Sequence, residues 1–241
     1  ESDAASVVRI AALSYIGIAK STILYIINRT KDVNEKVRLC AYNMIKDKIP
    51  LRALPIEMRS LLLKRGLNDR HIQVQQACYT MVIQAWLPSC QHDLITLLNF
   101  LYVDQYTQSC ELLVIQLLKD KSITLNTPSP PYTIDQLTNE HVFYWRICCQ
   151  ENKRHAADQY LPDCLEFCDL LYTIATVNNV QQEEGNQEGI QQPPQEMIDN
   201  VFMMQQLLQM CIYFDMSDEV GQRQLHALLK TLCGQVMYHS Q

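Results

Sequence analysis

The chain has 241 residues, of which 48% are hydrophobic and 19% charged, a balance typical of a globular protein rather than a disordered chain. Only 6 residues are glycine, which disfavours short strands joined by tight turns, and no apolar run approaches the roughly 18 residues that a membrane span needs. The net charge of −6 is uneven, because residues 1–71 carry 13 Lys/Arg and 7 Asp/Glu whereas residues 72–241 carry 7 and 19. The basic N-terminal part indicates a polyanionic partner at that end.

A short pattern recurs in this basic part: Asp, four residues, Val and then Arg. A small residue follows four positions after each Val, which would let a neighbouring helix approach closely. The copies start 29 and 37 residues apart, a spacing typical of two-helix solenoid repeats. They are DAASVVR (Asp3, Val8, Arg9), DVNEKVR (Asp32, Val37, Arg38) and a degraded DRHIQVQ (Asp69, Val74, Gln75), followed by Ala12, Ala41 and Cys78.

Helix signals surround the second and third copies. Asp32 is predicted to cap a helix that ends near Pro50, with Glu35 in the capping-box position. The next helix has Pro55 near its first turn and Gly66 just past its end, and Asn68–Asp69 is predicted to cap a helix that runs to about Trp86. The predicted apolar stripe of the first of these helices consists of Val33, Val37, Cys40, Ala41, Met44 and Ile45.

The remainder of the chain is also predicted to be helical. Helices are expected at 93–102, 107–119, 138–150 (capped by Thr138), 162–177, 197–214 and 221–238, with a proline-rich connection at 127–132. The segment 181–196, rich in Gln and Glu, is predicted to be a disordered loop. The predicted fold is therefore an all-α HEAT-repeat solenoid, in which antiparallel helix pairs stack into a curved superhelix: an array over 1–180, the loop, and a further helix pair over 197–241.

The sequence favours a non-catalytic protein. Its 10 cysteines lie mostly in apolar helical patterns, as expected for reduced thiols of an intracellular protein. The nearest approach to a metal cluster has no Cys-x2-Cys spacing, so core packing is the favoured interpretation; it comprises Cys148, Cys149, His155, Cys164 and Cys168. No nucleotide-binding or metalloprotease motif occurs. Catalytic residues, metal ligands and cofactors are not expected.

The basic segment 29–70 is the remaining chemical signal. Arg38 is expected to have a structural role, pairing with an Asp of the adjacent repeat. Several other cations lie at helix ends, where the helix dipole or simple solvation also explains them. Because helix ends in a solenoid line up along an edge, we expect a strip that contacts a phosphate backbone without sequence preference. Its candidate DNA-binding residues are Arg29, Lys31, Lys36, Lys46, Lys48, Lys64 and Arg65.

The stretch RTKDVNEKVRLCAY (29–42), followed by LRALPIEMRSLLLKRGLNDRHIQVQQAC (51–78) and AWL (85–87), resembles the CAP-G family of condensin subunits. LTNEHVFYWR (137–146) resembles a second stretch of that family, and the 197–238 helix pair looks like a later repeat. Gln75, where the pattern would have Arg, departs from it. The resemblance implies an internal HEAT-repeat segment of the non-SMC subunit of condensin I.

The resemblance also implies partners and a location. CAP-G proteins bind the kleisin subunit CAP-H and, with it, double-stranded DNA, whereas the ATPase belongs to the SMC subunits, which are reached indirectly through the kleisin. Mitotic chromosome condensation, a location in the nucleus, on chromosomes and in the cytoplasm, and no membrane association are the corresponding expectations. The alternative is a protein-only scaffold of the karyopherin or phosphatase type, which would not need a basic edge.

Overall fold

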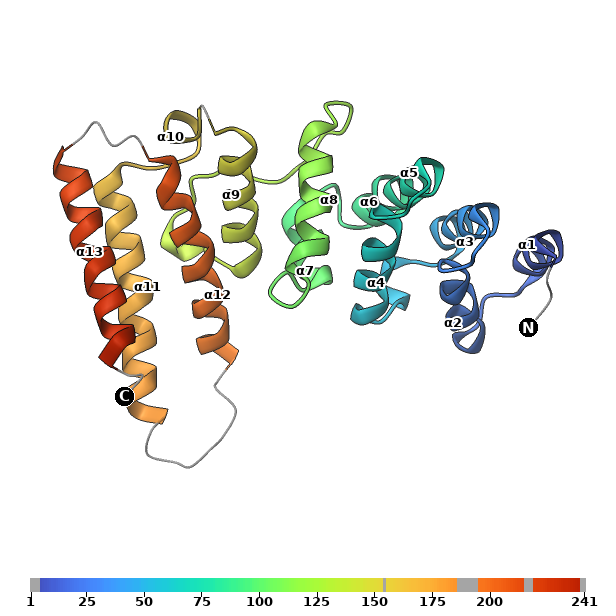
Figure 1. Cartoon of the computed structure of the whole chain (residues 1–241), viewed down its shortest axis with the longest axis horizontal. Helices are drawn as coiled ribbons and strands as arrows, with labels where there is room; N and C mark the ends of the chain where they lie inside the picture. The colour runs from blue at the N-terminus through green and yellow to red at the C-terminus, as the bar shows by residue number, and fades with distance from the viewer. Residues whose placement is uncertain (1–4, 154, 186–194, 215–218, 239–241) are drawn as a thin grey trace. The chain divides into compact units, whose positions relative to one another are not determined.

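The computed structural model describes residues 5–153, 155–185, 195–214 and 219–238, and the secondary structure of these residues is entirely helical. They fall into two compact units, residues 1–127 and 128–241, that are described one at a time (Figure 1). The predicted all-α solenoid class is confirmed by this arrangement of packed helices and by the structural match reported below. None of the described helices is both long and apolar enough to cross a lipid bilayer.

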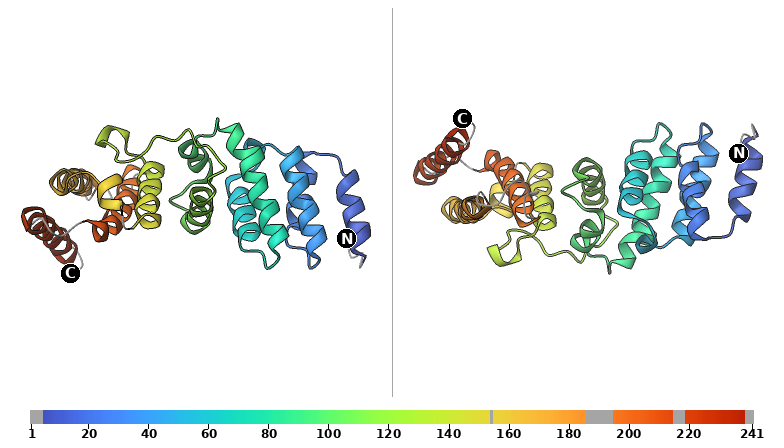
Figure 2. Two further views of the ribbon diagram at one scale, coloured as in Figure 1. Left: turned by 90° about the horizontal axis from the view of Figure 1, so that it is seen from above. Right: turned by 90° about the horizontal axis from the view of Figure 1, so that it is seen from below.

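Unit 1 is a stack of helix pairs. Helices α1, α3 and α5 lie side by side, α2 packs on α3, α4 packs on α5, and α8 packs on α4 (Figure 2). Short turns connect α2 to α3 and α4 to α5, so that the end of the first helix of each pair lies close to the start of the second. The helices are α1 (Ser6–Tyr15), α2 (Lys20–Arg29), α3 (Glu35–Lys48), η1 (Leu51–Ala53), α4 (Ile56–Leu67), α5 (Ile72–Met81), η2 (Val82–Trp86), α6 (Leu87–Ser89), α7 (Leu94–Leu101) and α8 (Thr107–Lys119).

The start of α3 differs from the prediction. Its N-cap is Asn34, whose side chain accepts a hydrogen bond from the Lys36 amide at 2.9 Å. Asp32 instead accepts from the Asn34 amide at 3.0 Å, and Val33 is 80% exposed rather than part of the apolar stripe. The reason is that the Asp32 carboxylate is held in the turn by an arginine of α1, so the helix begins two residues later.

The third copy repeats this geometry. Asp69, predicted to cap α5, accepts from the backbone amide of His71, which is the N-cap residue. The helical path then continues through the π-helical segment η2 and α6 to Ser89, past the predicted end at Trp86. Pro88 follows shortly after the π-helical segment, and the helix ends one residue beyond it, at Ser89.

Gly66 has a packing role that its predicted position past the helix end did not suggest. It lies inside the last turn of α4, and a Cβ atom there would come within 2.4 Å of Cys78 Cβ. The Tyr42 hydroxyl beside it donates to the Leu62 carbonyl at 2.8 Å. Three helices therefore meet closely at Gly66, and the small residue predicted in the third repeat, Cys78, is one of the contacts.

Unit 2 is built around aromatic side chains of α9. Trp145 contacts Phe167 and Tyr132 edge-on, and its indole donates to the Tyr160 carbonyl. Helix α12 packs against α9, and α11 packs against α12 and α13. The elements are η3 (Ile134–Gln136), α9 (Asn139–Glu151), α10 (Ala156–Gln159), α11 (Cys164–Gly185), α12 (Gln195–Met210), η4 (Cys211–Tyr213) and α13 (Glu219–Tyr238). Thr138 is the N-cap of α9, as predicted.

The connection between α11 and α12 is shorter than the predicted loop. Helix α11 continues to Gly185 and α12 begins at Gln195, because Gln and Glu are good helix formers. The rest of the expected loop, residues 186–194, lies outside the described residues. The boundary between the two units falls instead at Thr127–Pro128, in the proline-rich connection, and the predicted division at 181–196 stays a prediction.

Candidate nucleic-acid interface on unit 1

The repeat pattern forms an arginine–aspartate ladder, defined here as the pairs Arg9–Asp32 and Arg38–Asp69. In each pair the guanidinium donates twice to the carboxylate of the next repeat, at 2.9 and 3.0 Å in the first and 2.7 and 2.8 Å in the second. The side chains of Arg38 and Asp69 are only 5% and 8% exposed. The pairing predicted for Arg38 is therefore observed, whereas Asp3 lies outside the described residues.

The ladder sets the charge state of its acids. Burial by itself would raise the pKa of Asp32 and of Asp69, but hydrogen bonds from the arginines and from backbone amides outweigh it and lower both pKa values. The hydrogen bonds with Asp69 raise the pKa of Arg38 in turn. Both carboxylates are thus ionised at neutral pH and each is balanced by an arginine, so neither offsets the surface cations nearby.

Most of the predicted basic residues gather where the α2–α3 and α4–α5 turns meet. Arg65 of α4 donates to Thr30 Oγ1 at 3.3 Å, and Arg70 donates to the Val33 carbonyl at 3.1 Å, which ties the two turns together. We call this surface the turn edge. It comprises the predicted residues Arg29, Lys31, Lys36, Lys64 and Arg65, together with Arg70.

Lys46 and Lys48 do not belong to the turn edge. They lie in the last turn of the 14-residue helix α3, about 20 Å along the helix axis from its start. The expected single strip is therefore divided, because the C-terminal end of α4 lies beside the α2–α3 turn, at the start of α3, whereas Lys46 and Lys48 lie at the other end of α3. Lys46 also lies 3.4 Å from the carboxylate of Asp47.

The residues of the turn edge differ in how accessible their charges are. Lys31, Lys36, Lys64 and Arg70 are exposed. Arg29 is partly exposed and lies 3.5 Å from Asp32, and the guanidinium of Arg65 faces Thr30. Arg70 was not among the predicted DNA contacts. Its position directly after the ladder residue Asp69 could have indicated from the sequence that it lies on this edge. The turn edge thus has four exposed cations, of which Arg70 also ties the two turns together, and two less exposed ones, Arg29 and Arg65, which contact Asp32 and Thr30.

The other polar features of unit 1 have structural explanations. Arg59 is buried and donates to the carbonyls of Leu51 and Phe100 at 3.1 and 2.7 Å, and burial lowers its pKa. The Phe100 carbonyl belongs to the last turn of α7, where a cation is favoured by the helix dipole. Arg52 lies 5.0 Å from the Phe100 ring centroid. The contacts of Arg59 hold α4 against α7, whereas Arg52 belongs to η1 and is exposed.

Most of the cysteines described in unit 2 are buried thiols. The nine cysteines that the structure describes are free, and burial raises the pKa of Cys148, Cys149 and Cys168 to about 12. Within the described part of the chain, no group of three or more His, Cys, Asp or Glu is placed to hold a metal ion.

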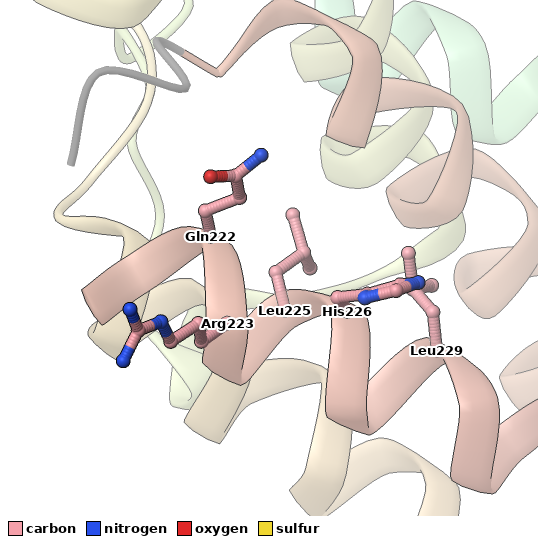
Figure 3. A pocket seen from close by; sticks show the side chains of 5 residues that line it. All are labelled: Gln222, Arg223, Leu225, His226 and Leu229. Carbon is pink, nitrogen blue, oxygen red and sulfur yellow. The ribbon is translucent and has the colours of Figure 1, made fainter. Parts of the chain in front are cut away.

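A pocket of about 440 Å³ on α13 is lined by Gln222, Arg223, Leu225, His226 and Leu229 (Figure 3).

Comparison with known proteins identifies relatives of one kind. No protein-family model matches the chain. Condensin complex subunit 3 of Homo sapiens is 31% identical over 252 residues, covering 96% of this chain and 24% of that protein. The Xenopus laevis and Saccharomyces cerevisiae proteins of the same name are 29% and 24% identical, each over 96% of this chain. The chain spans about a quarter of the length of these curated relatives.

A solved structure agrees with the fold. The crystal structure of the Schizosaccharomyces pombe condensin Cnd3–Cnd2 subcomplex superimposes with a TM-score of 0.79, at 24% sequence identity, over 96% of this chain and 31% of that chain. At this identity the match establishes the HEAT-repeat solenoid fold.

Proposed function

We propose that this chain is a HEAT-repeat segment of a condensin subunit 3 (CAP-G), of the condensin I type, and that it acts without catalysis. The observation that carries the proposal is the similarity of 93–96% of the chain to condensin complex subunit 3 from human to yeast. In this role it binds the kleisin CAP-H, reaches the SMC subunits through the kleisin, and serves mitotic chromosome condensation in the nucleus and on chromosomes.

We further propose that the turn edge contacts the phosphate backbone of double-stranded DNA. The charge balance supports this edge over the opposite one, because Asp32 and Asp69 are already matched by Arg9 and Arg38. Contacts from Lys31, Lys36, Lys64 and Arg70 to phosphates would release counterions and would be independent of sequence. Four such contacts contribute roughly −3 to −4 to the slope of log K against log salt.

The proposal is tested by measuring duplex binding against salt for the chain with and without a CAP-H segment. Lys31/Lys36/Lys64→Glu should lower affinity at least tenfold and reduce the salt slope by about 3. The matched control is Lys46/Lys48→Glu at the opposite end of α3, which should change both quantities much less. Equal affinity of the turn-edge variant and the wild type would overturn the assignment of the edge.

Kleisin binding is measured separately by co-purification with CAP-H. Both charge variants should retain it, because they alter exposed side chains and leave the ladder intact. Binding of CAP-H without any DNA binding, by the chain or the complex, would favour the alternative of a protein-only scaffold. Loss of both interactions in a folded wild-type chain would contradict the condensin proposal itself.

A further inference from the structure

The predicted DNA contacts that lie off the turn edge, Lys46 and Lys48, have an aromatic residue nearby. The chain passes from Lys48, at the end of α3, through a short connection into η1, so that Arg52 lies next to this end of α3. The Arg52 guanidinium is 5.0 Å from the centre of the Phe100 ring, which belongs to α7. The fold thus brings to these cations an aromatic side chain that is remote from them in the sequence.

Tyr102 supplies a second aromatic ring in this region. It is the C-cap of α7 and is 42% exposed. It lies near the Arg59 guanidinium, where it opposes the lowering of the Arg59 pKa by burial, and that guanidinium is 5.6 Å from the centre of the Phe100 ring. The backbone of Tyr102 is left-handed, with φ 55° and ψ 76°, a conformation that glycine adopts without strain and a bulky residue rarely adopts. Glycine would make this turn more easily, so the turn alone does not explain a tyrosine at this position.

We call this surface the aromatic edge, and its charges are few. Lys48 and Arg52 are exposed, whereas Lys46 lies 3.4 Å from the Asp47 carboxylate and the exposed Glu57 follows in the first turn of α4. Two outward cations release few counterions, so phosphate contacts alone would hold a duplex weakly. The aromatic rings and the arginine offer flat faces on which unpaired bases stack irrespective of sequence. The aromatic edge comprises Lys46, Lys48, Arg52, Phe100 and Tyr102.

We propose that the aromatic edge binds a single-stranded polynucleotide, with Tyr102 and Arg52 stacking on unpaired bases and Lys48 contacting a phosphate. The half-buried ring of Phe100 positions the Arg52 guanidinium. The site is separate from the turn edge, which lies at the start of α3 rather than its end. It goes beyond the proposed duplex binding and does not depend on it.

The test measures binding of the chain to two labelled strands of equal length by fluorescence anisotropy: oligo-dT and a strand of abasic deoxyribose phosphates. The wild-type chain should bind oligo-dT roughly tenfold more tightly, because only this strand has bases to stack. Tyr102→Gly should remove most of this preference. Glycine suits the left-handed turn, so the variant should remain folded, which thermal unfolding checks. Tyr102→Phe keeps the ring and should retain the preference.

The turn-edge variant Lys31/Lys36/Lys64→Glu is the control for the other surface. It should leave the preference for oligo-dT over the abasic strand unchanged, whatever its effect on duplex binding, so that the two proposals fail separately. An oligo-U arm shows whether DNA or RNA is the preferred single strand.

Three results would overturn the proposal. The first is that the wild-type chain does not bind oligo-dT, or binds it no more tightly than the abasic strand. The second is that folded Tyr102→Gly keeps the preference for oligo-dT. The third is that Tyr102→Gly weakens duplex and single-strand binding equally, since paired bases are not available to stack on a side chain.

Discussion

Removing one member of the buried rung tests the ladder most directly. In Arg38→Met the side chain keeps much of its apolar volume but loses both hydrogen bonds to Asp69 and those to the carbonyls of Asp32 and Val33. Asp69 is then a buried carboxylate whose strongest partner is gone. Removing one partner of a buried ion pair costs about 3–5 kcal/mol of unfolding free energy, and we expect Arg38→Met to fall in this range.

Urea unfolding followed by circular dichroism measures the effect. With a slope of about 1–3 kcal/mol per molar urea, a loss of this size lowers the midpoint by at least about 1 M. The matched control is Arg223→Met, which removes an ion pair to Glu219 at 3.0 Å whose side chains are 82% and 78% exposed; exposed pairs contribute little. If the urea midpoint of Arg38→Met equals that of Arg223→Met, the reasoning is refuted.

The pH dependence of the same variant provides a second check. Because the folded-state pKa of Asp69 is lowered, its contribution is present above its ordinary pKa of about 3.9 and is lost as the pH falls through the folded value. In Arg38→Met the burial of Asp69 is no longer offset by the guanidinium, so the charged carboxylate destabilises the folded variant. Protonation of Asp69 at low pH removes this destabilisation in the variant, whereas in the wild type it removes the stabilising ion pair with Arg38. The difference in stability should therefore shrink below about pH 4, and a constant difference across pH would contradict the electrostatic explanation.

Three further predictions concern packing, reactivity and capping. Gly66→Ala should cost about 1–3 kcal/mol, because the new Cβ meets Cys78 at 2.4 Å, whereas Gly17→Ala has nothing within 4 Å and should be tolerated; thermal unfolding distinguishes them, and equal effects would contradict the close contact. Cys149, whose pKa burial raises to about 12, should resist iodoacetamide in the native chain at pH 8 and react after denaturation; peptide mapping checks this, and rapid native labelling would contradict its burial. Asn34→Ala should cost about 0.5–2 kcal/mol through loss of the α3 cap, and unfolding with an unchanged midpoint would argue against it.

The sequence predicted the helices well because their signals are local. Apolar residues recur at helical spacing, and Thr138 caps α9 as its position implies. The helix α2 was not singled out, since it lies before the second copy of the pattern and has no side-chain cap. Asp32 was assigned to the wrong role because capping and ion pairing require the same residue type. Only the tertiary position of Arg9 decides between them.

The candidate interface shows where sequence reasoning stops. The excess of Lys and Arg over 29–70 is visible in the sequence, but the edge on which each cation lies depends on helix direction. Lys46 and Lys64 each lie in the last turn of a helix, yet the end of α4 lies beside the start of α3, so the two belong to different edges. Arg70 joins Lys31 and Lys36 although 34 residues separate it from Lys36. Which cations can follow one phosphate backbone is thus a property of the stacked repeats, and the ladder that fixes the stacking also neutralises the two acids that would otherwise weaken the turn edge.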